Sequence, residues 1–188
     1  MSTPTMTMQT GTTTWKIDAA HSVVEFKVRH MMISNVKGQF TVITGSMTLD
    51  PKDITKSRIE ASVDAASINT RDVQRDGHLK SPDFFDVENY PKLTLASTRV
   101  ERKSEGELAV TGNLTIHGVT REVVFDVEGP TPPRKDPWGN ARIGVSATAK
   151  INRKEFGISY NPLLDNGGAI VSDEIKLNLQ IELVQAPH

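Results

Sequence analysis

The sequence IKLNLQIELV, residues 175–184, alternates apolar and polar side chains without a break. A period of two is typical of a β-strand that buries one face and exposes the other. Strong alternation recurs in residues 22–30, 58–65, 107–117 and 141–152, and weaker alternation in residues 36–50 (bent near Gly45), 92–101 and 121–128. With a first strand near Trp15, the pattern predicts an all-β fold of about eight strands.

One segment, residues 69–90, departs from this pattern. Asn69 or Thr70 can cap a helix, and Ser81-Pro82-Asp83 repeats the start signal with serine before proline. We therefore expect two short helices, at residues 71–80 and 82–85, which make a helical excursion around residues 70–86. Two long loops are also expected, at residues 129–140 and 161–168.

The chain is organised around one domain. Its length of 188 residues suits a single all-β domain. Residues 1–14 are polar, with neither a basic nor an apolar region of a signal peptide, and are expected to be a disordered leader. Residues 15–184 form the predicted β-barrel domain, and residues 185–188 a flexible tail. A cytoplasmic location is expected if the chain is native from Met1.

Composition excludes several kinds of function. The 22 basic and 23 acidic residues are mixed along the chain, so no global field would hold nucleic acid or an acidic membrane. There is no cysteine, which removes disulfides, thiol catalysis and cysteine-ligated metals. The mean hydropathy is −0.35 and no apolar run approaches 18 residues, so no transmembrane helix or stable membrane anchor is expected.

Eight sequential antiparallel strands must protect their edges, and closure into a barrel does so completely. Only ten aromatic residues are available to fill the interior. Several positions predicted to face inward are small, among them Ala61, Gly112 and Ala147. The interpretation favoured is a barrel with an apolar tunnel along its axis; an ordinary sandwich core rich in alanine and valine is the alternative.

A tunnel of this kind would take a long, thin, apolar ligand. Each buried five-carbon prenyl unit would contribute at most about 4 kcal/mol. No charge is then needed along the chain, and polar groups matter only at a head group. The expected lining residues are Val24, Phe26, Val28, Phe40, Met47, Leu49, Ile59, Ala61, Val63, Ile68, Leu79, Phe84, Phe85, Leu95, Leu114, Ile116, Phe125, Val145, Ala147, Ile151, Phe156, Leu177 and Leu179.

Several segments together carry a family resemblance. The most specific is RDGHLKSPDFFD, residues 75–86, followed by Tyr90-Pro91. Others are WKIDAAHS (15–22), FKVRH (26–30), GQF (38–40), GNLTIHGVT (112–120) and INRKEFGI (151–158). In this order the chain resembles the YceI-like polyisoprenoid-binding family over nearly its whole length after residue 14.

The resemblance implies a lipocalin-like, extended eight-stranded antiparallel barrel with a helical excursion. It also implies a long pore that binds a polyisoprenoid or a lipid-like molecule such as a prenyl quinone, and a homodimer. No other cofactor is expected. Many relatives are periplasmic and carry a signal peptide; none is expected in this sequence, and a periplasmic location is the alternative to the cytoplasmic one.

Four polar residues are candidates for a ligand head group: His30, His78, Asp76 and Arg153. Three of them also have a structural interpretation. His30 can be a strand-end cap, His78 can tie the helix to the barrel rim, and Arg153 can form a surface ion pair. The five histidines show no ligand spacing, so no metal site is expected. Phe84 and Phe85 are expected to plug the barrel or to pack on its wall.

Three functions compete. The first, which we favour, is a non-enzymatic protein that binds an isoprenoid in the lumen for sequestration, transport or storage. The second is an enzyme that acts on an isoprenoid or quinone head group, with His30, His78 or Asp76 as acid or base. The third is a structural or stress-response barrel without a ligand.

Overall fold

A computed structural model of the chain describes residues 11–162 and 170–187. Twelve β elements are present: β1 (Thr13–Ile17), β2 (Val23–His30), β3 (Ser34–Phe40), β4 (Ile43–Leu49), β5 (Arg58–Asp64), β6 (Ile68–Asn69), β7 (Lys92–Ser104), β8 (Glu107–Ile116), β9 (Val119–Glu128), β10 (Arg134–Lys135), β11 (Ala141–Asn152) and β12 (Val171–Gln185). The helical elements are α1 (Val73–Lys80) and four short 3-10 turns, η1 (Ala19–His21), η2 (Ile54–Lys56), η3 (Ala65–Ser67) and η4 (Arg153–Phe156).

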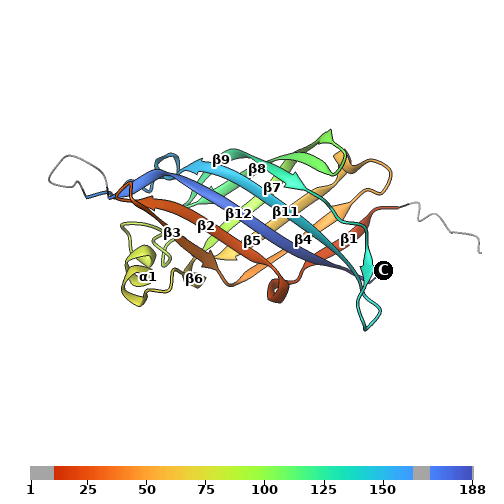
Figure 1. Cartoon of the computed structure of the whole chain (residues 1–188), viewed down its shortest axis with the longest axis horizontal. Coiled ribbons are helices and arrows are strands. Elements are labelled where there is room, and N and C mark those ends of the chain that lie inside the picture. The colour runs from red at the N-terminus through yellow and green to blue at the C-terminus, as the bar shows by residue number, and fades with distance from the viewer. Residues whose placement is uncertain (1–10, 163–169, 188) are drawn as a thin grey trace, which may run out of the picture.

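Eight strands form a closed antiparallel ring, in the order β11-β9-β8-β7-β5-β4-β1-β12 and back to β11. β2, β3 and β6 extend the sheet along the far part of β12, so the molecule is an elongated barrel with α1 beside one end (Figure 1). Closure leaves few unpaired strand edges. The predicted all-β, eight-stranded antiparallel barrel with a short helical excursion is confirmed.

Two long strands change partners part way along. β1 and β2 both run along the same edge of β12, separated by η1. β3 and β4 likewise pair with β2 and β1 in turn, on either side of Thr41 and Val42. Residues 36–50 are thus one interrupted strand. A bend was predicted near Gly45, but the interruption lies at residues 41–42.

The excursion contains one helix and not two. α1 begins after Asp72, whose carboxylate accepts a hydrogen bond from the Arg75 backbone amide at 3.0 Å, so Asp72 is the cap and not Asn69 or Thr70. Residues 82–85 form a turn. Its amides bond back to the end of α1: the Phe85 amide donates to the Leu79 carbonyl oxygen at 2.9 Å. Those bonds take the place of the backbone hydrogen bonds that a second helix would need.

The described residues extend a few positions beyond both ends of the predicted domain. Residues 1–10 of the predicted leader, residues 163–168 of the second predicted loop and His188 of the predicted tail lie outside them. β1 begins at Thr13, two residues before Trp15, and β12 continues to Gln185. Among residues 11–162 and 170–187, no helix has the length and hydropathy of a membrane span.

Candidate functional site

The interior of the barrel holds two apolar cavities, placed end to end. The first, the Phe84 cavity, has a volume of about 110 Å³ and lies at the α1 end. The second, the Ala147 cavity, has a volume of about 90 Å³ and lies further along the axis. Strand residues make up most of the wall of the Ala147 cavity, whereas α1, the turn at residues 82–85 and η4 supply a large part of the wall of the Phe84 cavity.

The two cavities adjoin each other on two of the strands. On β12, Leu177 lines the Phe84 cavity and Leu179, the next inward residue, lines the Ala147 cavity. On β7 the same change occurs between Leu93 and Leu95. Inward residues two apart on a strand are about 7 Å apart. On β11 one further inward residue, Ala149, lies between the residues that line the two cavities, so side chains form a thin partition across the apolar axis.

Some of the space expected beside small residues is already filled. Gly112 faces Leu95, whose Cδ1 would lie 2.8 Å from a β-carbon at position 112. Gly38 faces Phe26 in the same way. Ala147, by contrast, lines a cavity and is buried. Glycines in the wall thus accommodate large neighbours, whereas Ala147 leaves open volume.

Most residues expected to line a tunnel do line a cavity. The Phe84 cavity is walled by Phe26, Val28, Phe40, Leu79, Phe84, Phe85, Ile116, Ile151, Phe156 and Leu177. The Ala147 cavity is walled by Met47, Ile59, Leu95, Phe125, Val145, Ala147 and Leu179. The others line neither: Leu114 and Ile68 are buried, and Val24, Leu49, Ala61 and Val63 are half-buried.

Several wall residues were not expected. Leu93, Ile158, Val171 and Ile175 join the Phe84 cavity, and Ile54, Ser57, Arg58, Val100, Leu108, Val110, Val127, Pro130 and Ile181 join the Ala147 cavity. Leu108 and Val110 belong to the alternating face of β8, so the sequence pattern contained that signal. Val100 follows a bulge between Ser97 and Arg99, which reverses the inward phase of β7.

Arg153 is the one head-group candidate in a cavity wall, and its side chain is 5% exposed. Its guanidinium donates to the carbonyl oxygens of Ile158 and Tyr160 at 3.1 and 2.8 Å, and to that of Ser172 at 3.1 Å. Burial lowers its pKa below the usual arginine value, and Asp173 at 3.7 Å acts in the opposite direction. These contacts join the segment that follows η4 to the start of β12, and we call this arrangement the Arg153 clamp.

The other three candidates lie outside both cavities. Asp76 accepts hydrogen bonds from the Thr70 amide at 2.9 Å and from its hydroxyl at 2.5 Å, which ties α1 to the end of β6. His78 Nε2 lies 2.8 Å from Asp83 Oδ2, and its ring packs edge-on against Phe84 and Tyr160. His30 ends β2 opposite Ser34. The structure thus does not gather the four candidates into one polar cluster.

A separate charged cluster surrounds Arg142 near η1. Its guanidinium donates to Asp18 at 2.7 Å, Asp136 at 2.8 Å and Glu182 at 2.9 Å. The bond from Arg142 is the main reason that the pKa of each aspartate is lowered to about 2. Asp18, His21 and Glu182 also have ligand atoms within 4.8 Å of one another. Arg142 bonds to both carboxylates of that group, Asp18 and Glu182, so the cluster is an ion-pair network.

Comparisons with known proteins agree with this architecture. A family model described as a YceI-like domain matches residues 15–183. A UPF0312 protein of Staphylococcus aureus strain USA300 is 36% identical over 170 residues, which are 90% of this chain and 96% of that protein. The crystal structure of a Campylobacter jejuni YCEI protein is similar with a TM-score of 0.70 and 31% identity, and covers 86% of this chain and 91% of that one.

A further solved structure is a polyisoprenoid binding domain from Saccharophagus degradans, implicated in plant cell wall breakdown. It is similar with a TM-score of 0.65 over 92% of this chain and 98% of that one. Its sequence identity to this chain is 15%, and the likeness therefore concerns the fold.

Proposed function

Because this chain belongs to the family of proteins with a YceI-like domain, we propose that it binds the chain of an isoprenoid, such as a polyprenyl lipid or a prenyl quinone, in the barrel lumen. The observation that carries the proposal is the pair of apolar cavities aligned along one axis. The Saccharophagus degradans domain with the same fold, described as polyisoprenoid binding, supports the choice of ligand class.

The ligand chain must open the partition in order to occupy both cavities. Cavities that bind small molecules usually measure roughly 300–1,000 Å³, whereas these measure about 110 and 90 Å³. Leucine side chains such as Leu95 and Leu177 can change rotamer at modest cost. A flexible, methyl-branched chain then replaces their contacts with its own, and each prenyl unit gains up to about 4 kcal/mol from burial.

Binding is favoured over catalysis by the chemistry of the walls. Among the described residues that line the cavities, the ionisable side chains are Arg58 and Arg153. Both make hydrogen bonds to backbone carbonyl oxygens, at Ser57 for Arg58 and at Tyr160 for Arg153. Neither is a convenient general acid or base near neutral pH. Sequestration, transport and storage are all consistent with such a lumen.

Organic extraction of the purified protein, followed by mass spectrometry, tests the proposal. An extract that contains a prenyl lipid in about equimolar amount supports it. An empty extract, together with no rise in melting temperature when a prenyl quinone is added, would count against it. The predicted homodimer and cytoplasmic location remain predictions, to be checked by light scattering and by fractionation of cells.

A further inference from the structure

The turn between β2 and β3 presents three consecutive apolar side chains to solvent. Met31, Met32 and Ile33 are 38, 68 and 76% exposed. Met31 and Met32 have φ values of 51° and 59°, a left-handed conformation that is costly for residues other than glycine. Arg29 Nη2 holds the turn by donating to the Met32 carbonyl oxygen at 3.0 Å. The backbone thus supports an exposed apolar tip.

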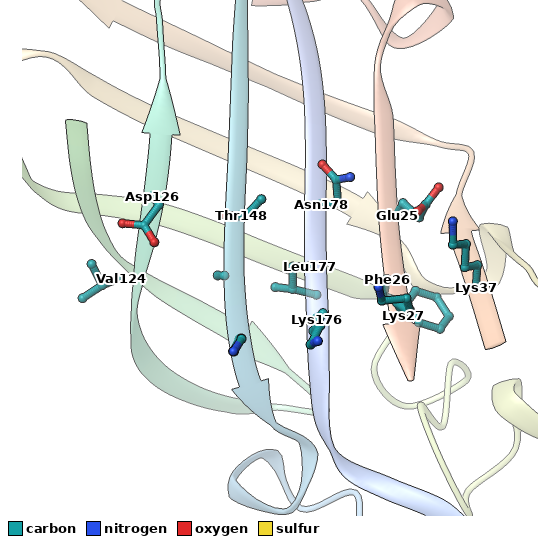
Figure 2. Close-up of a pocket in the computed structure, with 12 residues that line it drawn as sticks. Glu25, Phe26, Lys27, Lys37, Val124, Asp126, Thr148, Lys176, Leu177 and Asn178 are labelled. Atoms are coloured by element: carbon teal, nitrogen blue, oxygen red, sulfur yellow. The ribbon is translucent and has the colours of Figure 1, made fainter. Parts of the chain in front are cut away.

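A row of four lysines crosses the outer wall behind this tip. Lys37 pairs with Lys27, Lys27 with Lys176, and Lys176 with Lys150, so the four lie in register on adjacent strands. They border a hollow of about 580 Å³ on the outside of the barrel, and Figure 2 shows Lys27, Lys37 and Lys176 beside it. Like charges directly opposite one another destabilise a sheet. An anionic partner would therefore reduce the repulsion among the four lysines.

The charges of the row are not neutralised within the described part of the chain. None of the ion pairs between described residues includes one of the four lysines. Glu25 and Asp126 also border the hollow, and Asp126 is paired with Lys103 at 2.8 Å. The net charge of the whole chain is −1, so the row is a local cluster of positive charge on a nearly neutral molecule.

The apolar tip and the lysine row are close enough to contact one membrane surface at the same time. Lys27 precedes Met31 by four residues, or about 13 Å along an extended strand. Arg29 is exposed and lies between them. The attraction of a charged membrane extends over a Debye length of about 8–10 Å beyond the head groups. If the tip inserts and the lysine-bearing side of the barrel faces the membrane, the lysines therefore lie within the electrostatic field of the head groups.

We propose that this end of the barrel docks on a bilayer that contains anionic phospholipids, with Met32 and Ile33 among the acyl chains and the lysine row facing the phosphates. A soluble anion would use the lysines but would leave the apolar tip without a function, and a neutral bilayer would leave the lysines without one. The Phe84 cavity lies at the same end, since Val28 of β2 and Val171 of β12 both line it. Docking therefore places the lumen beside a source of lipid.

Vesicle sedimentation tests the proposal with the full chain freed of lipid. Vesicles of phosphatidylcholine are compared with vesicles that also contain phosphatidylglycerol, at low and at physiological salt. We expect binding to the anionic vesicles and its loss with salt. The tip variant Met32→Ser/Ile33→Ser should bind about tenfold more weakly or worse. The row variant Lys27→Gln/Lys176→Gln should lose about fivefold per lysine removed.

Matched controls lie at the other end of the barrel. Trp138 is 81% exposed, and Arg134 and Lys135 are also exposed. Trp138→Ser and Arg134→Gln/Lys135→Gln should bind vesicles as the wild type does. Unchanged binding by the tip variant, loss of binding by a control, or equal binding to neutral vesicles would overturn the proposal. Vesicle binding is measured without cargo, so its failure is distinct from a failure of isoprenoid binding.

Discussion

The ring of Phe26 lies across Gly38, its direct partner on the neighbouring strand β3. A β-carbon at position 38 would come within 2.7 Å of Phe26 Cε1, closer than real carbon atoms approach. Phe26 also packs against Phe40 with ring centroids 5.7 Å apart, and both rings line the Phe84 cavity. The glycine therefore determines where an aromatic wall of the lumen stands.

Gly38→Ala should displace Phe26 toward the cavity. Overpacking of this kind costs about 1–3 kcal/mol, so the free energy of unfolding in urea should fall, and prenyl quinone binding should weaken because the cavity shrinks. Gly77→Ala is the control. Gly77 lies within α1 with nothing within 4 Å of a β-carbon, and alanine there should stabilise by about 0.5–1 kcal/mol. Unchanged quinone affinity in Gly38→Ala would show that Phe26 does not line the quinone-binding site.

Ala147→Trp should fill the Ala147 cavity and abolish uptake of a prenyl quinone while the barrel remains folded. Ala147 is buried and lines the cavity, and the indole would occupy the free volume of about 90 Å³ that a ligand chain needs. The neighbouring residue Thr148 points outward and is exposed, so Thr148→Trp should bind normally. Circular dichroism checks the fold, and Ala147→Leu provides a milder change. Full uptake by both Ala147 variants would show that the ligand does not use this cavity.

The strands were predictable from sequence because alternation is a local consequence of burying one face, and residues 175–184 of β12 follow it without a break. Partner changes are not local. The break at Thr41 and Val42 arises where the strand leaves β2 for β1, and no residue there marks it. The inward position of Val100 likewise follows from a bulge in β7 that sequence alternation conceals.

The head-group candidates were predictable as polar residues but not in their contacts. Arg153 was expected to follow a strand, with a surface ion pair favoured over a contact to an anionic head group. Its actual partners are carbonyl oxygens of Ile158, Tyr160 and Ser172, which only the packing of η4 against β12 brings together. Backbone acceptors that come from distant segments leave no signal in a single sequence.

Arg153→Met should destabilise the barrel strongly. The substitution keeps much of the apolar stem but leaves three carbonyl oxygens without their donor, at a cost of about 3 kcal/mol or more. Arg153→Lys should rescue only part of this loss, because an ammonium cannot reproduce the guanidinium geometry. Lys154, the half-exposed neighbour, offers a control: Lys154→Met should change the free energy of unfolding by about 0.5 kcal/mol or less. Equal effects at the two positions would refute the clamp.

The Arg142 cluster predicts a loss of stability in acid. The pKa values of Asp18 and Asp136 are lowered to about 2, below the value of about 3.9 for an aspartate in an unfolded chain. Their contribution is therefore complete above pH ~4 and is lost as the pH falls toward 2. Arg142→Gln should flatten this part of the profile of urea midpoint against pH. A variant profile parallel to that of the wild type would contradict the assignment.

The central claim is that an isoprenoid chain lies inside the barrel. Photo-crosslinking with a farnesyl chain that carries a terminal benzophenone tests it most directly, because the labelled peptides report the position of the chain. Labelling should fall on inward residues such as Met47 in the Ala147 cavity or Leu79 in the Phe84 cavity, and unlabelled prenyl quinone should suppress it. Labelling confined to outward residues such as Val42 or Val124, or labelling that prenyl quinone does not suppress, would contradict the account.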